Sequence, residues 1–235
     1  MNKAFVIGHP IKHSRSPLIH GTWLEQYGIA GSYEPIDVAP ATLPEFFERL
    51  RAEEFAGGNV TIPHKEQVFA LCDSVDPLAR TIGAVNTLVA KGGRVHGFNT
   101  DFMGFLGNLD QNAPGWNLGL ERAIVLGAGG AARAILVALR ERGINDILVL
   151  NRTVEKASAL AAAIDGPFRA GALSEFAREA AGAGLVVNTT SIGMHDTRFE
   201  DLDLTLLPKS ALVTDIVYVP LVTPLLADAR ALGLR

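Results

Sequence analysis

The stretch AIVLGAGGAA, residues 123–132, decides the fold of the second half of this chain. An apolar run of strand length comes first, and Gly127, Gly129 and the small Ala132 then follow in a G-x-G-x-x-A arrangement before a helical pattern. In dinucleotide-binding folds, small residues at these positions let backbone N–H groups approach a pyrophosphate at a helix N-terminus. The sequence therefore predicts a dinucleotide site formed by Gly127, Ala128, Gly129, Gly130 and Ala131.

The sequence after the next strand indicates which dinucleotide is bound. The helix that follows the glycine turn leads to a second apolar strand, DILVL, at residues 146–150. NAD-binding sites usually carry an acidic residue at the tip of this strand, where it bonds the ribose 2′-hydroxyl. Here the tip reads Asn151-Arg152-Thr153, with Lys156 one turn further on. Arg152 would attract a 2′-phosphate, so the sequence favours NADP, with a surface arginine and a threonine N-cap as the alternatives.

The rest of the second half alternates helical and strand patterns. Helices are predicted at 131–143 and 154–164, and strands at 184–189 and 212–217. This alternation is typical of a parallel sheet covered by helices, so we predict a Rossmann-like α/β domain. The polar residues Thr189 and Thr190 follow a strand, as a loop that passes the cofactor would, although ordinary turn chemistry explains them equally well.

The first half of the chain is also predicted to be an α/β domain. Apolar runs of strand length lie at 4–7, 57–62, 84–90 and 94–98. Between them, residues 42–55 place Leu43, Phe46, Phe47 and Leu50 at helical spacing. We predict a mainly parallel sheet with covering helices, and a domain boundary near Asp101.

Three polar segments of the first half each follow a short apolar run where a helix could begin. They are HSRSP (13–17), NVTIPHK (59–65) and GFNTD (97–101). Lys65 is the most informative residue, because Pro63 suits the first turn of a helix and the helix dipole disfavours a cation there. Ser16 reads as an N-cap before Pro17, and hydroxyls at such a position can also bind a carboxylate. We expect the three segments to form the rim of one site.

Composition and charge exclude several classes of function. With 48% hydrophobic residues, 20% charged residues and a net charge of -4, the chain has an ordinary globular composition and no basic cluster for nucleic acid. Its single cysteine, Cys72, excludes an internal disulfide. No apolar stretch reaches the ~18 residues that a membrane span requires, so we expect a cytoplasmic protein without a membrane partner. The six histidines show no metal-ligand spacing, and we predict no metal.

Eight motifs in a fixed order relate the chain to a known family. They are GHPIKHSRSP, GGNVTIPHKE, GAVNTL, GFNTD, GAGGAAR, NRT, NTTSIGM and DIVYVP. In these motifs the chain closely resembles the shikimate dehydrogenase family over nearly its whole length. The resemblance implies NADPH-dependent, reversible reduction of 3-dehydroshikimate to shikimate, in the route to chorismate and the aromatic amino acids. It also implies two α/β domains with a cleft between them, residues 1–101 for the substrate and residues 102–235 for NADP.

The resemblance also implies roles for individual residues. It implies a catalytic pair, Lys65 and Asp101, in which the ammonium stabilises the charge that grows on the ketone oxygen and delivers the proton, while the carboxylate holds the ammonium. It implies that the substrate carboxylate is bound by Ser14, Ser16 and Tyr218, and the ring hydroxyls by Thr61, Asn86 and Asp101. Ile216 is implied to lie near the nicotinamide.

Simpler structural roles are open for the same residues. The alternatives are a solvated lysine for Lys65, a helix cap after Thr100 for Asp101, an amide satisfying nearby backbone for Asn86 and a β-former for Thr61. Among functions, a dual quinate/shikimate dehydrogenase and a non-catalytic NADP- or shikimate-binding module are open. By the resemblance, Ser16 favours shikimate, because quinate-using relatives often have a bulkier threonine there. The retained catalytic pair argues against a binding module. A homodimer is left open.

The resemblance does not extend beyond the C-terminal residue given. Family members continue past the position of Arg235 with a Gly-rich turn, a helix that carries a substrate-binding glutamine, and a last helix against the first domain. Residues 1–235 supply no such glutamine. If the tail helices are absent, we expect one lost hydroxyl contact, about 0.5–1.5 kcal/mol, and weaker substrate binding.

Overall fold

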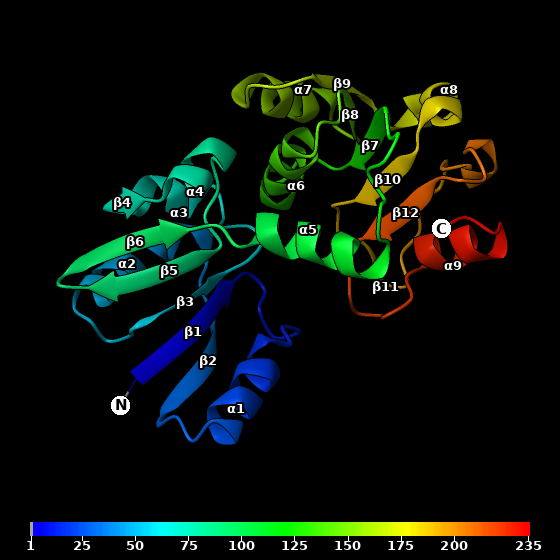
Figure 1. The fold of residues 1–235 in the computed structure, drawn as a ribbon. Coiled ribbons are helices and arrows are strands. Elements are labelled where there is room, and N and C mark those ends of the chain that lie inside the picture. The colour runs from blue at the N-terminus through cyan, green and yellow to red at the C-terminus, as the bar shows by residue number, and fades with distance from the viewer. Residues whose placement is uncertain (1) are drawn as a thin grey trace. The chain divides into compact units, whose positions relative to one another are not determined.

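The computed structural model describes residues 2–235, which form two compact units (Figure 1). The first unit ends at Asp101, and the second runs from Phe102 to Arg235. Each unit has its own sheet and its own core, and each is described by itself below.

The first unit is built on a six-stranded mixed sheet. Its elements are β1 (Asn2–Gly8), α1 (Ser16–Gln26), β2 (Gly31–Asp37), η1 (Pro40–Thr42), α2 (Leu43–Arg51), β3 (Gly57–Val60), α3 (Gln67–Leu71), β4 (Ser74–Val75), α4 (Pro77–Ile82), β5 (Thr87–Lys91) and β6 (Arg94–Phe98). The strand order is β2-β1-β3-β5-β6-β4. Strand β1 is parallel to β2 and β3, and β4 is parallel to β6, whereas β5 is antiparallel to both of its neighbours. Parallel pairings thus prevail in a sheet that is mixed.

A hairpin explains why β5 departs from the parallel pattern. Strands β5 and β6 pair in register from Thr87 opposite Phe98 to Lys91 opposite Arg94. The two residues between them, Gly92 and Gly93, have φ values of 61° and 70°. A two-residue turn with both φ values positive matches the twist of antiparallel strands, and glycine adopts it without steric cost.

The core of the first unit forms where α2 meets the sheet. Leu43, Phe46, Phe47 and Leu50 of α2 are all buried, which confirms the face predicted from their spacing. Phe5 of β1 meets the ring of Phe46 edge-on, with ring centroids 5.0 Å apart. Edge-to-face pairs of this kind add about 0.5–1.5 kcal/mol to the free energy gained by burying the rings. This contact anchors the helix to a central strand of the sheet.

Two helix starts differ from the sequence expectation. The chain after β3 first forms a turn, and α3 begins at Gln67, so Lys65 lies before the helix and not in its first turn. Helix α1 begins at Ser16 with Arg15 at the N-cap position, so Ser16 is not the cap. A proline such as Pro63 does not by itself determine where a helix begins, because proline is tolerated in turns as well as in the first turn of a helix.

The second unit is built on a five-stranded parallel sheet. Its elements are α5 (Asp101–Asn112), whose first residue closes the first unit, β7 (Arg122–Leu126), α6 (Gly130–Glu141), β8 (Asp146–Asn151), α7 (Val154–Ala163), β9 (Phe168–Ala172), η2 (Leu173–Glu175), α8 (Phe176–Glu179), η3 (Ala180–Gly182), β10 (Leu185–Asn188), β11 (Ile192–His195), η4 (Leu204–Leu206), β12 (Leu212–Asp215) and α9 (Pro224–Ala231). All pairings in the order β12-β10-β7-β8-β9 are parallel. This sheet confirms the predicted Rossmann-like domain.

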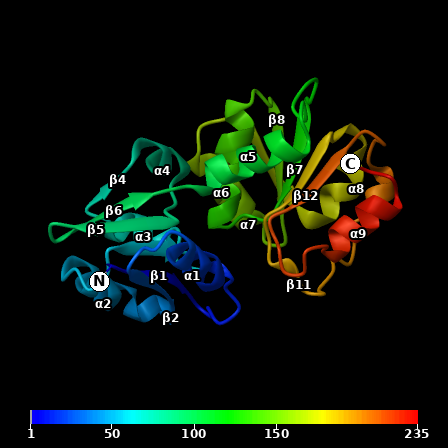
Figure 2. The same cartoon turned by 60° about the horizontal axis from the view of Figure 1, so that its bottom comes forward.

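Helices cover both faces of this second sheet. Figures 1 and 2 show α6 and α7 on one face and α8 and α9 on the other. The central strand β7 is buried on both faces, with Ile124 and Leu126 in the cluster that includes Phe176 of α8 and Leu225 of α9. Because the chain turns back from β9 to β10 across β7, the carboxyl ends of β7 and β10 form the crevice where such folds bind their ligands.

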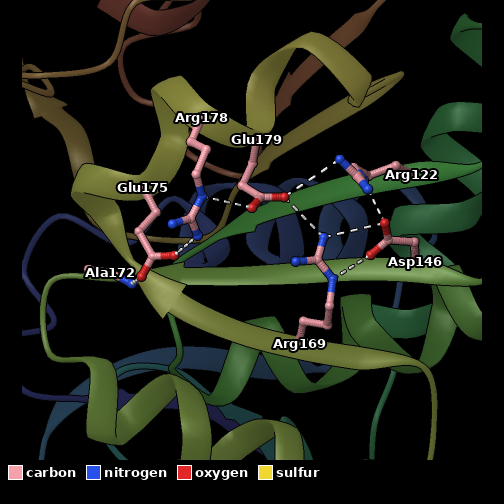
Figure 3. Close-up of polar contacts among 7 residues, drawn as sticks. All are labelled: Arg122, Asp146, Arg169, Ala172, Glu175, Arg178 and Glu179. Atoms are coloured by element: carbon pink, nitrogen blue, oxygen red, sulfur yellow. Dashed lines mark hydrogen bonds and ion pairs between the residues drawn. The ribbon is translucent and has the colours of Figure 1, made fainter.

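The amino ends of three neighbouring strands are joined by an ion-pair network (Figure 3). Asp146, the first residue of β8, accepts hydrogen bonds from Arg122 Nε at 2.5 Å and from Arg169 Nε at 2.9 Å. Glu179 of α8 accepts a hydrogen bond from Arg169 Nη2 at 3.1 Å. Burial by itself would raise the pKa of Asp146, but the hydrogen bonds from Arg169 and Arg122 hold it below its ordinary value. The network therefore stabilises the sheet while Asp146 is ionised.

We expect Asp146→Asn to lower the free energy of unfolding by about 1 kcal/mol at pH 7, because the arginines are partly exposed to solvent. A carboxylate whose pKa is lowered by folding contributes stability above its unfolded pKa, and this contribution is lost as the pH falls through the folded value. The difference between wild type and variant should thus shrink from pH 7 to pH 3 in urea unfolding. Glu121→Gln, at an exposed neighbouring position, should change little. A difference that does not vary with pH would contradict the network's role.

Candidate active site

Lys65 and Asp101 form a partly buried ion pair. The Lys65 Nζ donates to Asp101 Oδ2 at 2.8 Å, and the two side chains are 14% and 28% exposed. Lys65 lies in the turn between β3 and α3, and Asp101 is the first residue of α5. An ammonium carries three N–H bonds, and the carboxylate takes one of them. The pair can therefore hold the ammonium in a fixed place while it donates to a further oxygen.

Asn86 fixes the other oxygen of the same carboxylate. Its Nδ2 donates to Asp101 Oδ1 at 2.8 Å and to Thr100 Oγ1 at 3.0 Å. Its Oδ1 accepts from the backbone N–H of Thr100 at 2.9 Å. Asn86 is 7% exposed, so these bonds form away from bulk water. Both N–H bonds of the amide are used, and in this arrangement Asn86 orients Asp101; its predicted contact with a ring hydroxyl stays a prediction.

Strand register brings these segments to one edge of the first sheet. Asn59, near the end of β3, lies opposite Thr87 at the start of β5. Thr87 in turn lies opposite Phe98 at the end of β6. Since β5 is antiparallel to both neighbours, its start meets their ends. The polar segments 59–65 and 97–101 converge for this reason.

The loop after β1 reaches the same edge. The backbone N–H of Thr61 donates to Ile7 O at 2.9 Å, and a Cβ on Gly8 would lie 2.6 Å from Thr61 Cγ2. Glycine at position 8 thus allows the loop to pass close to Thr61. Further along it, Ser14 Oγ accepts a hydrogen bond from the backbone N–H of Ser16 at 3.3 Å, and both serines are half-buried. Their predicted role in carboxylate binding stays a prediction.

Tyr33, which no sequence motif predicts as a site residue, contacts the polar segment 59–65. Its hydroxyl donates to Asn59 Oδ1 at 2.6 Å, and its ring stacks on His20 with centroids 4.1 Å apart. Burial raises the pKa of Tyr33 to about 12, so the hydroxyl keeps its proton at neutral pH and acts as a donor. The sequence gives no signal for Tyr33, because its strand β2 lacks the alternation of apolar and polar residues that would predict a strand there.

In the second unit, the glycine turn follows β7 as predicted. Gly127 has a φ of 105°, and a Cβ there would lie 2.8 Å from Thr189 Oγ1 and 2.8 Å from Thr190 Cγ2. Thr189 Oγ1 also donates to Leu126 O at 2.7 Å. The loop after β10 is thereby held against the turn after β7. Glycine is required at position 127 for both its backbone conformation and this close approach.

The residues that follow the turn present an open helix N-terminus. Helix α6 begins at Gly130 with Gly129 as its N-cap residue, and a Cβ on Gly129 would meet nothing within 4 Å. The first N–H groups of a helix have no partner within the helix and favour an anion. The space beside Gly129 leaves room for a phosphate group, and the neighbouring Ala128, Gly130 and Ala131 have small side chains or none, which fits a dinucleotide cofactor.

The end of β8 provides positive charge in the same domain. Arg152, Thr153 and Lys156 are exposed, and Asn151 Nδ2 donates to Thr153 O at 2.8 Å. Within residues 2–235, neither Arg152 nor Lys156 pairs with a carboxylate. Two unpaired cations beside a threonine hydroxyl suit a phosphate group with two negative charges. This donor set fits the 2′-phosphate of NADP.

The loop after β12 carries the last predicted site residues. Ile216 is 36% exposed and Tyr218 is 58% exposed. The backbone N–H of Ile216 donates to Asn188 O at 3.1 Å, which keeps this loop beside the end of β10. The structure thus brings the loops after β7, β10 and β12 to one edge of the second sheet.

Among residues 2–235, no group of three His, Cys, Asp or Glu side chains is placed to hold a metal ion. In the same range, no helix is both long enough and apolar enough to cross a membrane.

A Rossmann-like sheet with a glycine turn at its crevice, together with a separate mixed-sheet unit that carries a lysine–aspartate pair, defines a two-domain, dinucleotide-dependent dehydrogenase. Residues 6–88 match the family "Shikimate dehydrogenase substrate binding domain", and residues 110–224 match "Shikimate / quinate 5-dehydrogenase". The chain belongs to the shikimate dehydrogenase family.

Individual relatives agree with this assignment. The chain is 55% identical over 234 residues to the shikimate dehydrogenase (NADP(+)) of Mesorhizobium japonicum, covering 99% of this chain and 83% of the relative. It is 51% identical over 236 residues to that of Brucella abortus, covering 99% and 81%. Among solved structures, the shikimate 5-dehydrogenase of Thermus thermophilus in complex with NADP(H) and shikimate has a TM-score of 0.84 at 42% identity, covering 100% of this chain and 86% of that one.

Replacing the two glycines separates folding from cofactor binding. We expect Gly127→Ala to destabilise the free protein by about 1–3 kcal/mol, because φ is positive and the new methyl group meets Thr189. Gly129→Ala should leave the melting temperature nearly unchanged, since space is open there, yet weaken NADP⁺ binding about tenfold or more by blocking a phosphate. Thermal melts and calorimetric NADP⁺ titrations measure both effects. Unchanged NADP⁺ affinity in Gly129→Ala would remove this turn from the cofactor site.

Proposed function

We propose that this protein catalyses the NADPH-dependent, reversible reduction of 3-dehydroshikimate to shikimate. The observation that carries the proposal is the Lys65–Asp101 pair at 2.8 Å, at the sheet edge where polar side chains converge. The close relatives in Mesorhizobium and Brucella carry the name of this activity. NADPH, when bound, supplies the hydride.

Lys65 supplies the complementary proton in this proposal. When a ketone carbon receives hydride, negative charge develops on its oxygen, and an ammonium beside that oxygen stabilises the charge and donates a proton. Asp101 keeps the ammonium in place, and Asn86 keeps Asp101 from turning away. In the reverse direction, neutral Lys65 accepts the proton of the same hydroxyl.

The remaining predicted residues orient the substrate in this proposal. Ser14 and Ser16, beside the start of α1, bind the substrate carboxylate through their hydroxyls, and Thr61 binds a ring hydroxyl. Tyr218 of the second unit serves as a further donor to the carboxylate. The cleft between the units, a homodimer and a cytoplasmic location stay predictions.

Quinate is the competing substrate. A quinate dehydrogenase from Corynebacterium glutamicum in complex with NAD has a TM-score of 0.88 at 32% identity. Quinate shares the carboxylate and ring hydroxyls, so the same donors would contact it. Comparing turnover of shikimate and quinate, each with NADP⁺ and NAD⁺, tests the proposal. Turnover of shikimate with NADP⁺ as the best pair supports it, and lack of turnover with either substrate contradicts it.

Lys65→Ala should lower turnover with shikimate and NADP⁺ by roughly 10²–10⁴-fold, the usual loss for a positioned acid or base. Substrate affinity should change much less, because the proton is transferred in the reaction step. Steady-state kinetics measure the two effects, and Lys91→Ala on the hairpin of the first unit is the matched control. Near-normal turnover of Lys65→Ala would remove this lysine from the chemistry.

Arg152→Ala should raise the KM for NADP⁺ by about 10–100-fold, the loss expected for one charge-assisted hydrogen bond to a phosphate. NAD⁺ has no 2′-phosphate, so its KM should stay within about threefold. The ratio of the two values in one variant corrects for changes in overall stability. An equal rise for both cofactors would show that Arg152 does not recognise the 2′-phosphate.

A further inference from the structure

Asp215 is a half-buried carboxylate to which the proposed reaction gives no role. It is the last residue of β12, directly before Ile216. Burial raises the pKa of Asp215, against the opposing effect of hydrogen bonds from Val217, Thr223 and Asn188. Removing part of a carboxylate from water is costly unless its oxygens accept hydrogen bonds, so the partners of Asp215 indicate its role.

The first oxygen of Asp215 joins two loops. Oδ1 accepts from the backbone N–H of Val217 at 2.9 Å and from Asn188 Nδ2 at 2.9 Å. The bond from Val217 closes the chain segment 216–218 back onto the end of β12. The bond from Asn188 ties this segment to the end of β10. The Oδ1 atom thus binds both the segment that follows β12 and the last residue of β10.

Asn188 extends the connection along the second loop. Its Nδ2 also donates to Ile192 O at 2.8 Å, and its Oδ1 accepts from Thr190 N at 3.0 Å and from Thr190 Oγ1 at 2.8 Å. Asn188 is fully buried, at 0% exposure. Its amide therefore spans the loop from Thr190 to Ile192 and links it to Asp215 without solvent in between.

The second oxygen of Asp215 is bound by a residue at the start of α9. Oδ2 accepts from Thr223 Oγ1 at 2.7 Å, and Thr223 is fully buried at the start of α9. A Cβ on Gly193 would lie 3.2 Å from Thr223 Cγ2 and 3.5 Å from Asp215 Oδ2. The chain after Ile192 thus lies against the same two residues. With both oxygens engaged, the carboxylate cannot rotate away from either loop.

We propose that Asp215 is a positioning residue for hydride transfer, which fixes the loops 189–193 and 216–218 relative to each other through Asn188 and Val217. This inference rests on the proposed function, because those loops carry Thr189, Ile216 and Tyr218. In this proposal Asp215 contacts neither substrate nor cofactor; it fixes the loops whose residues Thr189, Ile216 and Tyr218 are proposed to lie beside them.

The number of hydrogen-bond donors around the Asp215 carboxylate determines which substitutions test its role. The three partners of the Asp215 carboxylate are an amide N–H, a backbone N–H and a hydroxyl, which all can donate. An asparagine at position 215 would retain one oxygen for Asn188 and Val217, whereas an alanine would leave the backbone N–H of Val217 and one N–H of the Asn188 amide without an acceptor. Asp215→Ala and Asp215→Asn therefore form a matched pair of variants.

Amide hydrogen exchange tests the linkage without depending on activity. In Asp215→Ala, exchange should accelerate by about tenfold or more in both 189–193 and 216–218, and stay unchanged in strand β8. Asp215→Asn should remain within about threefold of wild type. Acceleration confined to 216–218 would overturn the inference, because Asp215 would then hold only its own turn.

A second pair of variants covers the case in which Asp215→Ala does not fold. Thr223→Val keeps the shape but removes the hydroxyl bonded to Oδ2, and Thr223→Ser keeps the hydroxyl. Faster exchange at 189–193 and 216–218 in Thr223→Val, and not in Thr223→Ser, supports the linkage. Faster exchange only in α9, which Thr223 also caps, would contradict it.

Kinetics then connect the linkage with the reaction. Wild-type turnover of shikimate with NADP⁺ tests the proposed function by itself, and the exchange data decide the loop linkage even if that turnover is absent. With active wild type, Asp215→Ala should lower kcat/KM about tenfold or more, and should cost clearly less in a Tyr218→Phe background, because residues that act together are not additive. A full, additive loss in that background would refute a role through Tyr218.

Discussion

The Asp101 carboxylate accepts one hydrogen bond from Lys65 and one from Asn86, so the direction of the Lys65 ammonium depends on a side chain that does not touch it. This arrangement requires the ends of β3 and β6 to lie beside the start of β5. The antiparallel hairpin is what places them together. In a wholly parallel sheet, the start of β5 would lie at the opposite edge, and Asn86 could not reach Asp101.

In the second unit, a parallel sheet brings the loops of the proposed cofactor site together. The loops that follow its strands emerge at one edge because every strand runs in the same direction, and close contacts between these loops then fix their shapes. Gly127 permits the approach of Thr189, and Asn188 joins the next loop to Asp215. These contacts attach the loops to the ends of the strands beneath them.

Features carried by local pattern could be predicted from the sequence, and features carried by distant pairing could not. The glycine turn, the amphipathic α2 and the order of motifs are local, and the predicted Rossmann-like sheet and family were confirmed. Sequence patterns do not reveal β2, β4 and β9, which all lie at sheet edges and pair with one strand only. Strand β2 reads GSYEPID, with a proline and two acids that an edge tolerates and a periodic apolar pattern does not reveal. Tyr33 lies on β2, and the bond from Asn188 to Asp215 depends on the pairing of β10 with β12, which no local pattern specifies.

The ion-pair network of Arg122, Asp146, Arg169 and Glu179 occupies the amino ends of the second sheet, whereas the glycine turn and the loops beside it occupy the carboxyl ends. The length of the strands therefore separates the ion-pair network, which affects stability, from the loops at the carboxyl ends, which are proposed to bind the cofactor. Substitutions at the amino ends can adapt the protein to another temperature or salt concentration while the loops keep their shape. Laboratory evolution of heat resistance can start there and leave the cofactor-binding turn unaltered.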